Sequence, residues 1–131
     1  MIKNILQMKQ LKRYYTIKAD PKDVYNALTN QKMLEIWTGE TALMSLEPNS
    51  DFSLWGGSIS GKNIEFEPNK KIVQHWYFGE EEDSVVTIKL HEHKKGTSVE
   101  LHQTNIPEEA FDNISEGWDE DYFGALNELF I

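Results

Sequence analysis

The sequence predicts an α+β fold in which a curved antiparallel sheet wraps around a long carboxy-terminal helix, with two short helices after the first strand. Three observations support this prediction. Residues 51–76 contain three apolar extended segments, separated by a Gly-Gly turn at 56–57 and a Glu-Pro-Asn turn at 67–69, which is typical of an antiparallel meander. Two short helical patterns precede the meander. A long helical pattern ends the chain, and it is the only predicted element able to cover the apolar face of the sheet.

The first strand is predicted at residues 11–18, where Tyr14-Tyr15-Thr16-Ile17 has strong β-propensity. Asp20 and Pro21 are typical of the N-cap and first position of a helix. That helix has its apolar residues at helical spacing, namely Val24, Ala27 and Leu28. Thr29-Asn30 interrupts the pattern, and a second short helix follows at Gln31 to Trp37 and stops at Gly39.

A hairpin is predicted from residues 85–93 and 97–105, joined by a turn around Gly96. Alternation assigns one face of this hairpin to the core, with the residues Val86, Ile88, Leu90, Val99 and Leu101. The terminal helix is predicted from about Ser115 to the end of the chain. Its apolar residues recur at helical spacing, at Trp118, Tyr122, Leu126 and Leu129.

The length of 131 residues suits one domain. We expect that domain at residues 11–131, after an amino-terminal extension at 1–10 that can form part of the first strand. The sequence has no cysteine, which excludes disulfides and thiolate metal sites and is typical of a reducing compartment. No segment has the apolar length of a signal peptide or of a membrane span. We therefore expect a cytoplasmic protein without a membrane span.

The charge distribution argues against nucleic acid as a partner. The formal net charge is -9, and an acidic surface repels a phosphate backbone. The acidic run at residues 80–83 lacks the spaced ligands and the glycine of a calcium loop. We expect that run to form a solvated hairpin loop.

Three histidines are candidate metal ligands. His91 and His93 are two residues apart on one strand face, and His102 lies on the neighbouring strand. The alternative is an exposed ladder of polar cross-strand pairs, in which a four-residue turn places His91 opposite Glu100 and Lys89 opposite His102. We favour the ladder and therefore expect no metal site and no cofactor.

Two further sets of polar residues were considered for catalysis. Glu65 and Glu67 flank Phe66 and could act as an acid and base pair if they pointed inward. His75 beside Trp76 could act as a general base, but the sequence shows no carboxylate to orient it. Solvated carboxylates and a hydrogen-bonded histidine are the favoured alternatives, so no catalytic residue is assigned.

Five aromatic residues could line an apolar cavity between the sheet and the terminal helix. They are Trp37, Phe52, Trp76, Trp118 and Tyr122. Aromatic walls are common in apolar ligand sites, whereas the same residues can equally form plain core.

The chain also resembles a known family, the AHSA1-like (activator of Hsp90 ATPase homologue-like) branch of the Bet v 1-like, START-related helix-grip superfamily. The resemblance covers about Leu11 to Ile131. It is carried by Val24, Ala27, Leu28, Thr29, Trp37, Gly61, Pro68, Ile72-Val73, Trp76, Gly96-Thr97, Ile106-Pro107 and Gly117-Trp118. It implies a six- or seven-stranded sheet around a long carboxy-terminal helix. Where many members have a glycine pair before the second long strand, this sequence has Asn49-Ser50.

The resemblance also bears on function. Activators of the Hsp90 ATPase carry a domain of this kind at their carboxy-terminal end, and a separate amino-terminal domain drives the stimulation. The 131 residues contain neither that domain nor its asparagine- and tryptophan-rich motif, so we do not expect this activity to transfer. Elsewhere in the superfamily the cavity binds lipids, sterols, polyketides or plant hormones, and a few members are cyclases or hydrolases.

The function expected from these observations is non-catalytic binding of a small apolar or amphipathic molecule. One alternative is an interaction module that contacts a chaperone or stress-related partner through its acidic helix and loops. Another is a hydrolase or cyclase that uses Glu65, His75 or Tyr122 in the cavity.

Overall fold

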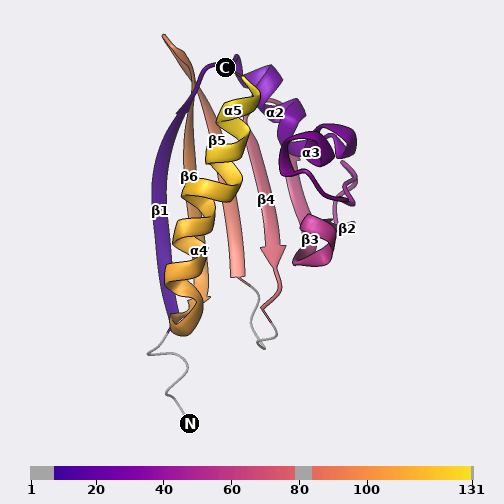
Figure 1. The fold of residues 1–131 in the computed structure, drawn as a ribbon, viewed down its shortest axis with the longest axis vertical. Helices are drawn as coiled ribbons and strands as arrows, with labels where there is room; N and C mark the ends of the chain where they lie inside the picture. The colour runs from indigo at the N-terminus through magenta and orange to yellow at the C-terminus, as the bar shows by residue number, and fades with distance from the viewer. Residues whose placement is uncertain (1–7, 79–83, 131) are drawn as a thin grey trace.

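The fold is a six-stranded antiparallel sheet with a helical layer on one face, as Figure 1 shows. The computed structural model describes residues 8–78 and 84–130. The strand order is β1-β6-β5-β4-β3-β2, so the first strand in the chain lies beside the last. The predictions for the acidic run at 80–83, and for residues 1–7 of the amino-terminal extension, fall outside the described residues.

The strands confirm the predicted meander and hairpin. Their bounds are β1 Met8–Ile17, β2 Asp51–Leu54, β3 Ile59–Glu67, β4 Lys71–Trp76, β5 Ser84–His93 and β6 Gly96–Pro107. A single turn of 3₁₀ helix, η1 (Trp55–Gly57), joins β2 to β3 at the predicted Gly-Gly turn. Side chains alternate between the two faces of the sheet, and those on one face meet the terminal helix in a single core.

The helix pair lies where the sequence predicts it. Helix α2 is Pro21–Thr29 and helix α3 is Gln31–Thr38. Asn30 joins them, and its side chain accepts a hydrogen bond from the Met33 backbone N–H at 3.0 Å. Gly39 ends α3 with φ 79°, a left-handed conformation that glycine adopts without a steric penalty.

The terminal helix begins earlier than predicted. It consists of η2 (Glu108–Ala110), α4 (Phe111–Gly117), η3 (Trp118–Tyr122) and α5 (Phe123–Leu129). The predicted start at about Ser115 was wrong because Phe111 and Ile114 continue the apolar face toward the amino end and pack against the core. The η3 segment is one turn of π-helix, in which the Phe123 backbone N–H donates to the Trp118 carbonyl.

The β5–β6 hairpin has a shorter turn than predicted. His93 pairs with Gly96, so only two residues form the turn. The predicted pairs of His91 with Glu100 and of Lys89 with His102 were therefore wrong. Lys89 lies opposite Glu100, and His91 reaches Glu100 diagonally at 3.3 Å.

A change of register in β3 determines which of its side chains face the helix. The pairing with β4 shifts between Asn63 and Glu65, which is typical of a β-bulge. Asn63 is fully buried on the inner face, whereas Glu65 and Glu67 are exposed. Both carboxylates lie near the Lys71 ammonium group, at 2.9 Å for Glu65 and 3.9 Å for Glu67.

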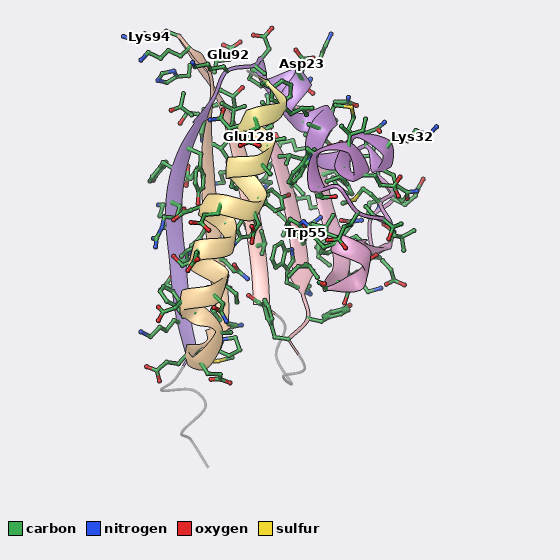
Figure 2. The ribbon with its side chains drawn as sticks, viewed as in Figure 1. Asp23, Lys32, Trp55, Glu92, Lys94 and Glu128 are labelled. Carbon is green, nitrogen blue, oxygen red and sulfur yellow. The ribbon has the colours of Figure 1, made fainter. Side chains whose placement is uncertain are left out.

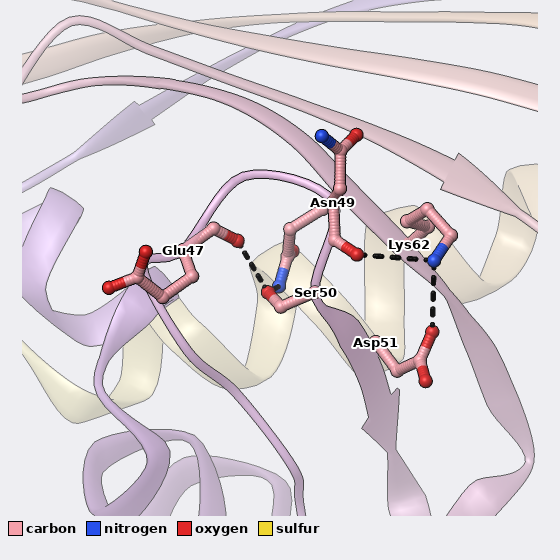
Figure 3. A network of polar contacts seen from close by, with 6 residues as sticks. Glu47, Asn49, Ser50, Asp51 and Lys62 are labelled. Atoms are coloured by element: carbon pink, nitrogen blue, oxygen red, sulfur yellow. Dashed lines mark hydrogen bonds and ion pairs between the residues drawn. The ribbon is translucent and has the colours of Figure 1, made fainter.

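The loop before β2 is fastened to β3, as Figure 3 shows. Asn49 has φ 67°, a left-handed conformation that asparagine adopts more readily than most residues other than glycine. Its carbonyl accepts from Lys62 Nζ at 3.1 Å, and Lys62 also contacts Asp51 at 3.3 Å. Within the loop, the Ser50 hydroxyl donates to the Glu47 carbonyl at 2.6 Å.

Within the described residues, every helix is too short or too polar to cross a bilayer.

Candidate functional site

A cavity of about 560 Å³ lies between the terminal helix, the end of β4 and the η1 turn. Its apolar wall contains the side chains of Trp55, Ile59, Trp76, Ile114, Trp118 and Tyr122. Its polar side chains are Thr38, Glu40, Ser58, Asn113 and Asp121. Figure 2 labels Trp55 at η1, on the side of that turn toward the terminal helix. The volume and the apolar wall are typical of small-molecule sites.

Three of the five predicted site residues line this cavity: Trp76, Trp118 and Tyr122. The other two, Trp37 and Phe52, pack behind its wall. The Trp37 ring meets Tyr122 edge-on with centroids 5.1 Å apart, and Phe52 lies against Trp76 at 6.4 Å. The five predicted residues therefore form one aromatic cluster. Three of them line the cavity, and the other two pack behind these three.

The π turn in the terminal helix shapes this cluster. Trp118 contacts both Tyr122 and Phe123, with ring centroids 4.5 Å and 5.6 Å apart. A π turn holds one more residue than an α turn, so two consecutive side chains can face the sheet here. Both are buried: Tyr122 faces the cavity, and Phe123 stacks on Tyr15 of β1 at 4.4 Å.

The indole of Trp76 is held by a chain of buried amides. Its Nε1–H donates to Gln74 Oε1 at 3.0 Å, and Gln74 Nε2 donates to Asn63 Oδ1 at 2.9 Å. Asn63 Nδ2 in turn donates to the Ser45 carbonyl at 3.2 Å and to Ser50 Oγ at 3.1 Å. This chain couples a cavity wall to the loop before β2, and buried amides need such partners.

Trp118 is held in the same way from the other side. Its Nε1–H donates to Gln103 Oε1 at 2.8 Å, and Gln103 Nε2 donates to Ser84 Oγ at 2.9 Å. The Ser84 hydroxyl donates to the Thr104 carbonyl. Both tryptophans therefore use their only donor inside the protein, and they present ring surface to the cavity.

Tyr122 adds a polar atom to the aromatic wall. It is 4 % exposed, and no described residue hydrogen-bonds its hydroxyl. Burial raises the pKa of this hydroxyl well above its usual value. Tyr122 therefore offers the cavity a neutral hydroxyl that can donate a hydrogen bond.

The residues considered for catalysis do not meet in this cavity. Glu65 lies on the outer face of the sheet, where its hydrogen bond to Lys71 raises the pKa of that ammonium group. His75 is half-buried on the outer face of β4, between the inward-facing Gln74 and Trp76. Only Tyr122 of the three residues considered for a hydrolase or cyclase lines the cavity.

The histidine candidates lie on the solvent face. Of the residues that the structure describes, no group of three or more His, Asp or Glu side chains could hold a metal ion. His91 contacts Glu100, while His102 contacts Gln10 Oε1 of β1 at 3.0 Å. These contacts are those of an exposed polar ladder.

A second depression, of about 1170 Å³, opens between the start of α2, the β3–β4 turn and the β5–β6 hairpin. Its wall is mainly charged and includes Lys22, Lys70, Lys71, Lys89 and Lys94. It lacks the aromatic wall of the first cavity, so the smaller cavity is the better candidate for a small apolar ligand.

The sequence patterns do not predict a site role for the amides Asn63, Gln74 and Gln103, or for Trp55 and Ile59. Alternation carries a usable signal for two of the amides. Gln74 lies two residues before the inward Trp76, and Gln103 lies two residues after the inward Leu101. A long polar side chain at an inward strand position indicates a buried hydrogen-bonding partner.

Comparison with known proteins gives the same picture of the fold. The family described as "Activator of Hsp90 ATPase homolog 1-like protein" matches residues 18–130. An activator of 90 kDa heat shock protein ATPase homolog from Dictyostelium discoideum is 32% identical over 127 residues, which cover 93% of this chain and 33% of that protein. The human homolog 1 is 23% identical over 118 residues, covering 88% of this chain and 35% of that protein. The chain thus spans about a third of the length of these relatives.

Solved structures are similar over almost the whole chain. An Hsp90 activator from Plasmodium falciparum has a TM-score of 0.80 and 25% identity, covering 94% of this chain and 95% of that one. A structure described as the Aha1 dimer from Colwellia psychrerythraea has a TM-score of 0.81 and 19% identity, covering 93% and 96%. The second likeness bears on the fold alone.

Proposed function

We propose, for a chain that belongs to the activator of Hsp90 ATPase homolog 1-like family, that its domain binds a small apolar or amphipathic molecule without transforming it chemically. The observation that carries this proposal is the 560 Å³ cavity with its wall of tryptophan rings. The candidate ligand-binding residues are Trp76, Trp118 and Tyr122 at the wall, with Trp37 and Phe52 as support.

The expected affinity follows from the apolar surface that such a ligand would bury. Burial of about 200 Å² at roughly 25 cal/mol/Å² gives on the order of 5 kcal/mol before the cost of immobilising the ligand. Apolar contact alone therefore supports weak binding. Hydrogen bonds or charge interactions at the cavity would be needed to reach micromolar affinity.

The proposal can be tested by titrating the protein with fatty acids, sterols and aromatic polyketides while following NMR shifts and tryptophan fluorescence. Native mass spectrometry of the protein purified without denaturation would show whether a molecule is retained. We expect saturable shifts at Trp55, Trp76 and Trp118. A panel without any saturable response would contradict the proposal.

A variant that obstructs the cavity makes the test specific. Ile59 lines the cavity, so the larger ring of Ile59→Trp should obstruct it and abolish binding. Ile36 is 65% exposed on α3, so Ile36→Trp adds the same ring outside the cavity and serves as the matched control. Binding that survives Ile59→Trp in a folded protein would place the ligand elsewhere.

A second proposal is that the domain contacts a chaperone of the Hsp90 type. Its support is the 32% identity to the Dictyostelium activator over 93% of this chain. The cytoplasm is the proposed place for either function, in keeping with the absence of cysteine from the sequence. Titration of the labelled domain with purified Hsp90, with an unrelated acidic domain as control, would test the contact. A lack of NMR line broadening at stoichiometric Hsp90 would contradict it.

A further inference from the structure

We infer that the cavity selects neutral or cationic aromatic ligands and rejects anionic ones, because its rim carries two carboxylates and its wall includes tryptophan ring faces. This inference rests on the proposed function and specifies its ligand. Apolar and amphipathic ligands in general include fatty acids and other carboxylates. The negative charges at this cavity argue against the binding of fatty acids and other carboxylates.

Trp76 and Trp118 offer the cavity aromatic surface and no free hydrogen-bond donor. The indole N–H groups of Trp76 and Trp118 are both donated to buried glutamines. What the two rings can present to a ligand is their π-face, which stacks on flat rings and attracts cations. The neutral hydroxyl of Tyr122 adds one donor, suited to a hydroxyl or carbonyl oxygen of a neutral ligand.

The rim carries negative charge from two separate elements. Glu40 follows α3, and its carboxylate lies near η1, with Oε1 3.7 Å from where a Cβ on Gly56 would be. Asp121 belongs to the terminal helix. Both side chains are exposed, and neither forms an ion pair with a described residue.

The lining contains no basic residue to offset these carboxylates. None of its described side chains is Lys, Arg or His. The helix that forms one wall, residues 111–129, also contains acidic residues and no basic one. A cleft lined by charge of one sign concentrates ligands of the opposite sign and excludes those of the same sign.

A set of three naphthalene ligands of similar size tests the inference, namely 1-naphthylmethylammonium, 1-naphthalenemethanol and 1-naphthoate. We expect the ammonium and the alcohol to bind, and the carboxylate to bind at least about tenfold more weakly than the ammonium at low ionic strength. This ratio should shrink as salt is added, because the carboxylates of the rim are exposed. Calorimetry and NMR shifts would measure both quantities.

Variants then connect the selectivity to the two carboxylates. Glu40→Gln combined with Asp121→Asn should reduce the ratio of the ammonium affinity to the carboxylate affinity several-fold. Glu128→Gln removes an exposed carboxylate of the same helix outside the cavity and should leave the ratio as it is. Equal binding of the three ligands, tighter binding of 1-naphthoate, or an unchanged ratio in the double variant would overturn the inference while leaving the proposed function intact. If none of the three ligands binds, both proposals fail for aromatic ligands of this size.

Discussion

The rings of Trp76 and Trp118 stack on each other across the gap between β4 and the terminal helix, with centroids 4.7 Å apart and planes inclined by 24°. Each ring is fixed at its edge by a different glutamine. The stack therefore joins the sheet to the helix and forms the shared wall of the cavity. Its position depends on buried hydrogen bonds as well as on packing.

Gln103→Leu should destabilise the protein by about 1–3 kcal/mol, because it leaves the Trp118 indole N–H buried without its acceptor. Urea unfolding would measure the change. His102→Gln alters the adjacent side chain on the outer face and should stay within about 0.5 kcal/mol.

Trp118→Phe combined with Gln103→Leu should cost less than the sum of the two single changes, because the double variant leaves neither partner of the hydrogen bond unpaired. We expect a coupling energy of about 0.5–3 kcal/mol from a double-mutant cycle in urea. Strict additivity would mean that the hydrogen bond does not hold the ring.

Much of the fold could be predicted from short-range patterns. Asp20-Pro21, Asn30 and Gly39 mark the ends of α2 and α3, because capping preferences act over a few residues. The register of the β5–β6 hairpin could not be read correctly in this way. A two-residue and a four-residue turn are both compatible with Lys94-Lys95-Gly96. The two turn lengths give different registers, so every residue of β5 would lie opposite a different residue of β6.

The candidate site was harder to predict than the fold. Because Trp76, Trp118 and Tyr122 are aromatic, they could be predicted to pack in one cluster. Which ring faces the cavity depends on packing between elements that are distant in sequence. The sequence therefore could not show that Trp37 packs behind the cavity wall instead of lining it. The π turn at Trp118–Tyr122 has no sequence signature of its own.

Tyr122→Phe should make the protein less sensitive to alkaline pH. Burial raises the folded-state pKa of Tyr122 above the usual value near 10. Such a group contributes full stability below the unfolded pKa and loses that contribution as pH rises from about 10 toward the folded pKa. Between pH 8 and pH 11 the native protein should lose on the order of 1 kcal/mol more stability than the variant.

Urea unfolding at both pH values would measure this difference. Tyr14→Phe is a matched control, because the Tyr14 side chain is 63% exposed on the outer face of β1. Equal pH dependence of stability in the native protein and in Tyr122→Phe would contradict a raised pKa of Tyr122 in the folded state.

EDTA should leave the melting temperature unchanged. Of the described residues, no cluster of His, Asp or Glu has the arrangement of a metal site, and His91 already contacts Glu100. Calorimetry with and without the chelator would check this. A drop of several degrees would restore the metal hypothesis.

Gly61→Ala and Gly117→Ala should change stability in opposite directions. A Cβ at Gly61 would lie 1.8 Å from the His75 carbonyl oxygen, so β3 and β4 would have to separate. We expect a loss of about 3 kcal/mol or more, or failure to fold.

A Cβ at Gly117 would meet only Asp121 Oδ2, at 4.0 Å, and the residue has a helical φ of -61°. Alanine there should stabilise the helix by about 0.5–1 kcal/mol. Thermal and urea unfolding of the two variants would measure both effects, and a Gly61→Ala protein as stable as the native one would be incompatible with the close approach of β3 to β4.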